Sequence, residues 1–144
     1  MEQKLKENLI NQFKKVCRDN NLKITPQRTI IYEELIKSCD HPSVDALYKR
    51  VRDKLPDVSF DTVYRSLITF GELGVADVIE GVCSTKRYEG NTKPHYHFVC
   101  TKCGSITDIF DIDFDFKIPE VIQKKYAPKS TRVIFDGICE SCKN

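Results

Sequence analysis

The 144-residue sequence has no apolar run of about 18 residues, so we expect no membrane-spanning helix. Its first ten residues, MEQKLKENLI, lack the apolar segment of a secretory signal. No internal repeat and no low-complexity tract is evident, which argues against a repeat architecture. From these absences we expect a cytoplasmic protein that does not associate with a membrane.

Net charge is also low, because the sequence has 23 Lys and Arg residues and 21 Asp and Glu residues, for a formal charge of +2. The charge is unevenly distributed, however: residues 1–28 hold seven basic and three acidic side chains. Global charge therefore neither supports nor excludes a nucleic-acid partner, and such a claim must depend on local pattern.

The first half of the chain predicts helices. An amphipathic helix is indicated by apolar residues that recur at spacings of three and four: Leu5, Leu9, Phe13 and Val16. Residues suited to cap the N-termini of three further helices follow at Thr25, Ser43 and Ser59. Beyond them, residues 75–80 and 84–89 are short extended runs around a turn at Gly81. Helices followed by a small hairpin are the outline of a winged helix-turn-helix domain.

The second half predicts a smaller α/β unit, which makes the fold class α+β. Residues 91–94 have the composition of a linker between residues 1–90 and 95–144. Residues 96–100 and 105–110 are expected to form strands that flank a turn, residues 119–126 a helix and residues 132–138 a strand.

The helix that begins after Ser59 has two different faces. On a helical wheel Val63, Leu67 and Phe70 form a stripe that we expect to be buried. The opposite face carries Asp61, Tyr64, Arg65, Ile68 and Thr69. Such side chains suit base edges, thymine methyl groups and phosphates, although an ordinary solvated face has a similar composition. The hairpin and the basic N-terminal segment favour DNA.

Two Cys-x-x-Cys pairs, Cys100/Cys103 and Cys139/Cys142, are the strongest chemical signal. Two such turns supply the four thiolates of a closed tetrahedral zinc site, which would be structural because no coordination position stays open. A redox dithiol and four buried free cysteines are the alternatives. The remaining cysteines lack metal-ligand spacing and are interpreted as core or incidental residues: Cys17, Cys39 and Cys83.

A second metal site is indicated by histidines and carboxylates. His95 and His97 lie two apart in an extended run and therefore share one face. If residues 101–104 form the turn of a hairpin, Asp108 pairs with His97 on that face. With His41 and Glu89 these residues would make a mixed nitrogen and oxygen site suited to Fe(II) or Mn(II). A small metallohydrolase that activates water at this site is the rival hypothesis.

Several motifs, in this order, resemble the ferric-uptake-regulator superfamily and within it the peroxide-stress regulators. They lie between about residue 23 and residue 142: Lys23 to Arg28 (KITPQR), His41 to Ser43 (HPS), Ser59 to Arg65 (SFDTVYR), Glu89, His95 to His97 (HYH), Cys100 to Gly104 (CTKCG), Asp108 and Cys139 to Cys142 (CESC).

The resemblance implies a transcriptional repressor, not an enzyme, that acts as a homodimer on A/T-rich inverted repeats in double-stranded DNA. Residues 1–90 would be the winged-helix DNA-binding domain, 91–94 a hinge and 95–144 a zinc-stapled dimerisation and metal-sensing domain. Each subunit would hold one structural zinc at the four paired cysteines. It would also hold one regulatory iron or manganese ion at His41, Glu89, His95, His97 and Asp108.

The resemblance also assigns DNA contacts: Tyr64 and Arg65 in the major groove and Lys23 in the minor groove, with Gln27, Arg28 and Thr62 in the same motifs. The motifs match two different sensed signals. Asp108 favours a peroxide sensor, in which oxidation of His41 or His95 would release DNA. Glu89 instead matches the iron-uptake regulators, so an iron-responsive repressor is the alternative.

Overall fold

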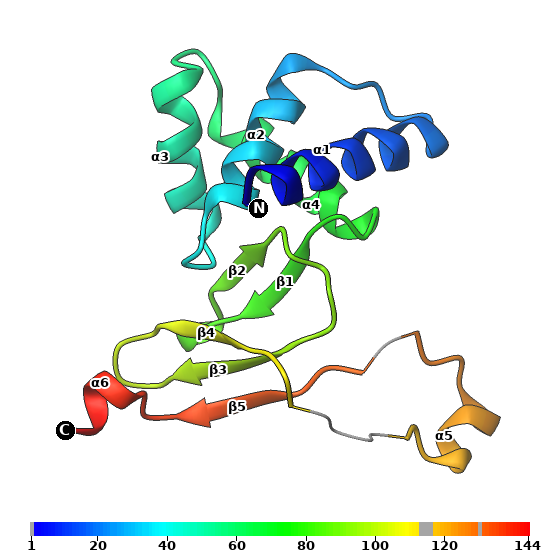
Figure 1. The fold of residues 1–144 in the computed structure, drawn as a ribbon, viewed down its shortest axis with the longest axis vertical. Helices are drawn as coiled ribbons and strands as arrows, with labels where there is room; N and C mark the ends of the chain where they lie inside the picture. Colours follow the sequence, from blue (N-terminus) through cyan, green and yellow to red (C-terminus); the bar gives the residue numbers. More distant parts are fainter. Residues whose placement is uncertain (1, 113–116, 130) are drawn as a thin grey trace. The chain divides into compact units, whose positions relative to one another are not determined.

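The computed structural model describes residues 2–112, 117–129 and 131–144, and its residues fall into two compact units, Met1–Lys93 and Pro94–Asn144. In the described part of the chain, no helix is long and apolar enough to cross a membrane. Four helices and then a hairpin make up the first unit, while the second is built on a small sheet (Figure 1).

The first unit consists, in chain order, of α1 (Glu2–Asp19), α2 (Pro26–Lys37), α3 (Val44–Lys54), α4 (Phe60–Glu72), β1 (Asp77–Glu80), the short 3-10 turn η1 (Val82–Ser84) and β2 (Lys86–Glu89). The three predicted helix caps are confirmed. The Thr25 and Ser43 hydroxyls each accept from a backbone N–H at 3.2 Å, and the Ser59 hydroxyl does so at 3.1 Å. Each bond satisfies an amide that the first helical turn leaves without a partner.

An aromatic cluster forms the centre of the first unit's core. The Phe13 ring stacks on Tyr32 with centroids 4.3 Å apart and meets the edge of Phe70 at 5.1 Å. Phe13 is fully buried, but Leu5, predicted to share its face, is 47% exposed. The predicted helix is confirmed, but only its second half, through Phe13 and Cys17, contributes fully buried side chains to the core.

Replacing Phe13 with alanine should lower the free energy of unfolding of the first unit by about 3–5 kcal/mol, because a large cavity would open among tightly packed rings. Urea denaturation followed by circular dichroism measures this loss. The matched control is Phe60→Ala, since Phe60 is 46% exposed and should lose less than about 1 kcal/mol. Equal losses in the two variants would contradict the assignment of the core.

Strands β1 and β2 form an antiparallel hairpin in which Val78 pairs with Tyr88 and Asp77 with Glu89. The hairpin follows α4 directly, as in a winged helix-turn-helix. Immediately after β2, Gly90 lies so close to α2 that an added Cβ would meet Ile36 Cγ2 at 2.6 Å. This close approach holds the end of β2, and with it Glu89, against α2.

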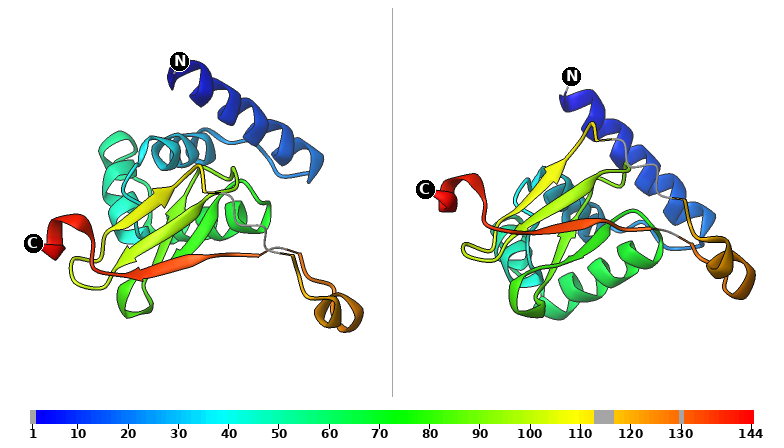
Figure 2. Two further views of the ribbon diagram at one scale, coloured as in Figure 1. Left: turned by 60° about the horizontal axis from the view of Figure 1, so that its bottom comes forward. Right: turned by 90° about the horizontal axis from the view of Figure 1, so that it is seen from below.

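The second unit contains β3 (Tyr96–Cys100), β4 (Ile106–Ile109), α5 (Glu120–Lys125), β5 (Ile134–Gly137) and α6 (Glu140–Lys143). The sheet order is β4-β3-β5, with β4 antiparallel and β5 parallel to β3. Figure 2 shows α5 beyond one end of the three strands and α6 beyond the other. The predicted hairpin register is confirmed, since His97 pairs with Asp108.

Candidate metal centres and nucleic-acid surface

The four paired cysteines lie together at one end of the three-stranded sheet. Cys100 ends β3, and the turn after it closes with Gly104 donating its N–H to the Cys100 carbonyl at 2.9 Å and adopting φ +76°. Cys139 caps α6 and Cys142 lies within it. The four sulfur atoms all lie within 4.8 Å of one another, and Cys103 and Cys139 are 3.7 Å apart. A tetrahedral site with Zn–S bonds of about 2.3 Å separates its sulfurs by roughly 3.8 Å, so the arrangement fits zinc.

Neighbouring groups shift the pKa values of two of these thiols in opposite directions. The pKa of Cys100 is lowered to about 6, chiefly because the backbone N–H groups of Cys103 and then Cys139 donate to its sulfur, each at 3.4 Å. The pKa of Cys142 is raised to about 12, first by its hydrogen bond with the Cys139 side chain and then by burial. Four thiolates this close repel one another unless a dication neutralises them.

Within the first unit, His41 and Glu89 form one pair of candidate ligands. His41 precedes Pro42 between α2 and α3, whereas Glu89 ends β2. The His41 Nε2 and Glu89 Oε1 atoms are 3.5 Å apart, and both side chains are buried. His41 adopts φ +51°, a left-handed backbone conformation that residues other than glycine adopt only when their surroundings hold them there.

Within the second unit, the other candidate ligands converge on one carboxylate. The Asp108 Oδ1 atom lies 3.1 Å from His95 Nε2 and 3.2 Å from His97 Nε2. The two imidazole centroids are 4.5 Å apart, and the His95 ring also stacks on Phe110. Two imidazoles and a carboxylate around one point have the mixed donor set that Fe(II) and Mn(II) accept.

Helix α4 separates a buried stripe from an exposed face, as its wheel predicts. Val63, Leu67 and Phe70 are fully buried, whereas Tyr64 is 43% exposed. The Arg65 side chain is 78% exposed and its Nε atom lies 2.9 Å from Asp61 Oδ2. Exposed i,i+4 ion pairs contribute little to stability, so Arg65 is available to other partners.

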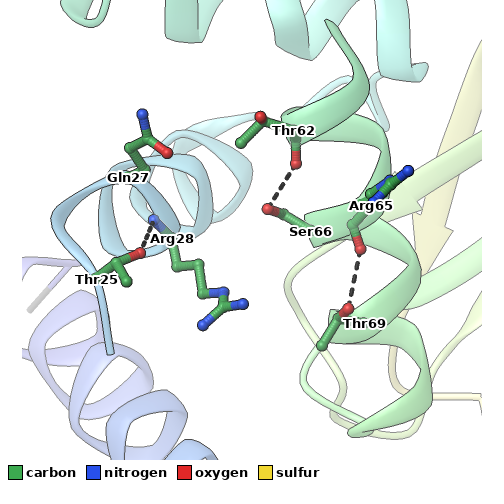
Figure 3. A pocket seen from close by; sticks show the side chains of 7 residues that line it. All are labelled: Thr25, Gln27, Arg28, Thr62, Arg65, Ser66 and Thr69. Atoms are coloured by element: carbon green, nitrogen blue, oxygen red, sulfur yellow. Dashed lines mark hydrogen bonds between the residues drawn. The ribbon is translucent and has the colours of Figure 1, made fainter. Parts of the chain in front are cut away.

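A cavity of about 250 Å³ separates the start of α2 from α4 (Figure 3). It is lined by Thr25, Gln27, Arg28, Thr62, Arg65, Ser66 and Thr69. Figure 3 shows the Arg28 side chain extending into the space between the helices and that of Arg65 pointing away from it. The Arg28 guanidinium also donates to the Lys23 carbonyl at 2.5 Å. Four predicted DNA-binding residues therefore line one polar cavity: Gln27, Arg28, Thr62 and Arg65. Arg65 is also exposed on α4, as is Tyr64.

Arg87 is a residue that the sequence pattern does not single out. From β2 it donates to the backbone carbonyls of His41, through Nε, and of Asp40, at 2.9 Å. On the other side of the same loop, Arg50 makes a two-point ion pair with the Asp40 carboxylate, and this ion pair lowers the pKa of Asp40. The only sequence signal for Arg87 is its position two residues before Glu89, on the same side of the strand.

The first unit has a wing and a helix that exposes arginine and tyrosine side chains, and the second unit has four clustered thiols. These features define a winged-helix, metal-binding class of protein. Residues 19–136 match the profile of the Ferric uptake regulator (FUR) family. The chain belongs to that family, whose members are metal-responsive, DNA-binding transcription regulators.

Individual relatives agree with this assignment. The chain is 35% identical over 143 residues to the ferric uptake regulation protein of Bacillus subtilis, covering 94% of this chain and 95% of that protein. It is 33% identical over 128 residues to the peroxide-responsive repressor of Staphylococcus epidermidis, with coverages of 88% and 85%. The solved structure of the Helicobacter pylori ferric uptake regulator, described as having three functional metal-binding sites, superposes with a TM-score of 0.73 at 25% identity, with coverages of 96% and 94%.

Proposed function

We propose that this protein is a metal-dependent transcriptional repressor that binds A/T-rich inverted repeats as a homodimer. The observation that carries the proposal is that the first unit holds both a candidate DNA-contacting face and a candidate pair of metal ligands. One folded body presents both the exposed Tyr64 and Arg65 face of α4 and the buried His41–Glu89 pair. A metal ion at that pair can therefore act on the body that contacts DNA.

The proposal assigns two ions to each subunit. Zinc is held by Cys100, Cys103, Cys139 and Cys142 and is structural, because four thiolates close its coordination shell. Iron or manganese is held by His41, Glu89, His95, His97 and Asp108. These ligands come from both units, so an ion bound by all of them restricts the angle between the units.

The second unit has the surface that a homodimer requires. Large apolar side chains are exposed on it, including Phe110, Val121, Tyr126 and Ile134. A second copy of the chain would bury them, and two first units could then contact the two halves of an inverted repeat.

In the proposed complex, α4 enters the major groove. The Arg65 guanidinium donates to guanine or to phosphate oxygens, and the Tyr64 ring contacts thymine methyl groups. Lys23 enters an adjacent narrow minor groove, where A/T sequence concentrates negative potential. Arg28 bonds the Lys23 carbonyl and so restrains the segment that carries this lysine. Gln27 and Thr62 contact the phosphate backbone.

We further propose that peroxide is the signal. Asp108 at the two-histidine centre supports a peroxide sensor, and a peroxide-responsive repressor is among the relatives. Bound Fe(II) would activate hydrogen peroxide, one oxygen atom would be added to the ring of His41 or His95, and water would be the other product. The ferric uptake regulation protein of Bacillus subtilis supports the alternative, in which DNA is released when iron is scarce.

A gel-shift series tests the proposed function. Zinc-loaded protein is titrated onto an A/T-rich inverted repeat with and without Mn(II), and onto a G/C-rich duplex of equal length as the control. We expect tight binding only for the inverted repeat with Mn(II). Absence of metal-dependent binding on every inverted repeat tested would refute the proposal.

A further inference from the structure

We infer that Arg87 is a positioning residue for the His41–Glu89 pair, and that it fastens the wing to the loop that carries His41. The inference rests on the proposed function, because it takes this pair as ligands of the regulatory ion. Arg87 itself does not coordinate metal: its guanidinium donates to the backbone carbonyls of Asp40 and His41.

Strand β2 contacts His41 at both its side chain and its backbone carbonyl. Arg87 and Glu89 are two residues apart and therefore lie on the same side of the strand. Glu89 places its carboxylate 3.5 Å from the His41 imidazole, while Arg87 bonds the carbonyl oxygen of the same residue. Between them, the Tyr88 N–H donates to the Pro42 carbonyl at 3.0 Å. Movement of β2 therefore displaces both metal ligands.

The conformation of His41 explains why such a fastening is needed. A non-glycine residue at φ +51° is disfavoured, so the surrounding contacts must hold it. The opposite side of the loop is fixed by Arg50, which binds the Asp40 carboxylate and donates to the Ser38 hydroxyl at 2.8 Å. Arg87 supplies the charge-assisted bonds on the wing side.

Through Arg87, metal binding at His41 can change the wing of the unit that contacts DNA. The wing is the β1–β2 hairpin, and its second strand carries Arg87, so ordering of His41 by an ion also orders β2. Mutation of a residue that orients metal ligands without touching the ion typically lowers metal affinity by about 10- to 100-fold. We expect that range for the loss of Arg87.

The test measures the Mn(II) affinity of the full-length, zinc-loaded protein by electron paramagnetic resonance of free Mn(II). Arg87→Met removes both donors and should weaken Mn(II) binding about 10- to 100-fold. Lys86→Met is the matched control, since it removes the same charge from the neighbouring exposed position of β2 and should change affinity less than about 2-fold. Arg87→Lys keeps the charge and one donating group and should fall between them.

Two further readouts separate positioning from general loss of structure. Zinc content and the far-ultraviolet circular dichroism of the Mn(II)-free protein should match between Arg87→Met and Lys86→Met. With Co(II) as the probe, the ligand-field absorption of the regulatory site should change in Arg87→Met only. In a His41→Ala background, adding Arg87→Met should weaken Mn(II) binding by a smaller factor than it does in the unmodified protein, because one of the two ligands that Arg87 positions is already gone.

The outcomes distinguish the inference from the proposed function. If the unmodified protein binds no Mn(II), both are refuted. If it binds Mn(II) and Arg87→Met behaves like Lys86→Met, the role of Arg87 is refuted and the proposed function stands. An equal effect of Arg87→Met with and without His41 would also overturn the role assigned to it.

Discussion

Replacing Cys100 with serine should remove zinc and abolish dimerisation and DNA binding together. Cys100 is fully buried at the end of β3 and accepts backbone N–H bonds from both Cys-x-x-Cys turns, so its sulfur joins the two ends of the zinc site. Structural zinc sites typically contribute on the order of 10 kcal/mol to folding. Zinc content by metal analysis, subunit association by analytical ultracentrifugation and DNA binding by anisotropy measure the three losses.

Cys83→Ser is the matched control for this prediction. Cys83 is exposed on the turn between β1 and β2, in the other unit, and should keep full zinc content and dimerisation when replaced. A Cys100→Ser protein that lacks zinc but still dimerises would show that the metal does not hold the second unit together.

Treatment of the Fe(II)-loaded protein with one equivalent of hydrogen peroxide should add one oxygen atom to a peptide that contains His41 or His95 and should release DNA. Both imidazoles lie within hydrogen-bonding or ion-pairing distance of a carboxylate that the proposal assigns to the same ion. Peptide mass spectrometry locates the added oxygen, and anisotropy follows the loss of DNA binding.

The Mn(II)-loaded protein is the control, because Mn(II) occupies the same mixed site without reducing peroxide as Fe(II) does. It should stay unmodified and remain bound to DNA. Unmodified His41 and His95 peptides in the Fe(II)-loaded protein, with DNA released only by an iron chelator, would instead support the iron-responsive alternative.

Much of the fold could be predicted because its signals are local. The caps at Thr25 and Ser59 depend on hydroxyl groups three residues before a free amide, and the β3–β4 register follows from a turn of known length. The buried stripe of α4 follows from helical periodicity alone.

What could not be predicted depends on contacts between distant residues. Leu5 has the periodicity of a core residue, yet the core ends before it reaches that turn of α1. The bonds from Arg87 to the loop before α3 join residues 46 and 47 positions apart, and the left-handed conformation of His41 has no residue-type signal as clear as glycine. The parallel pairing of β5 with β3 likewise has no local signature.

The central claim, that metal and DNA binding are coupled, can be tested by measuring the Mn(II) affinity of the zinc-loaded protein with and without a saturating A/T-rich inverted repeat. Linkage requires that DNA raise the Mn(II) affinity by the same factor by which Mn(II) raises the DNA affinity. We expect matching factors of about 10-fold or more. An Mn(II) affinity that is the same in the presence and absence of DNA would contradict the account.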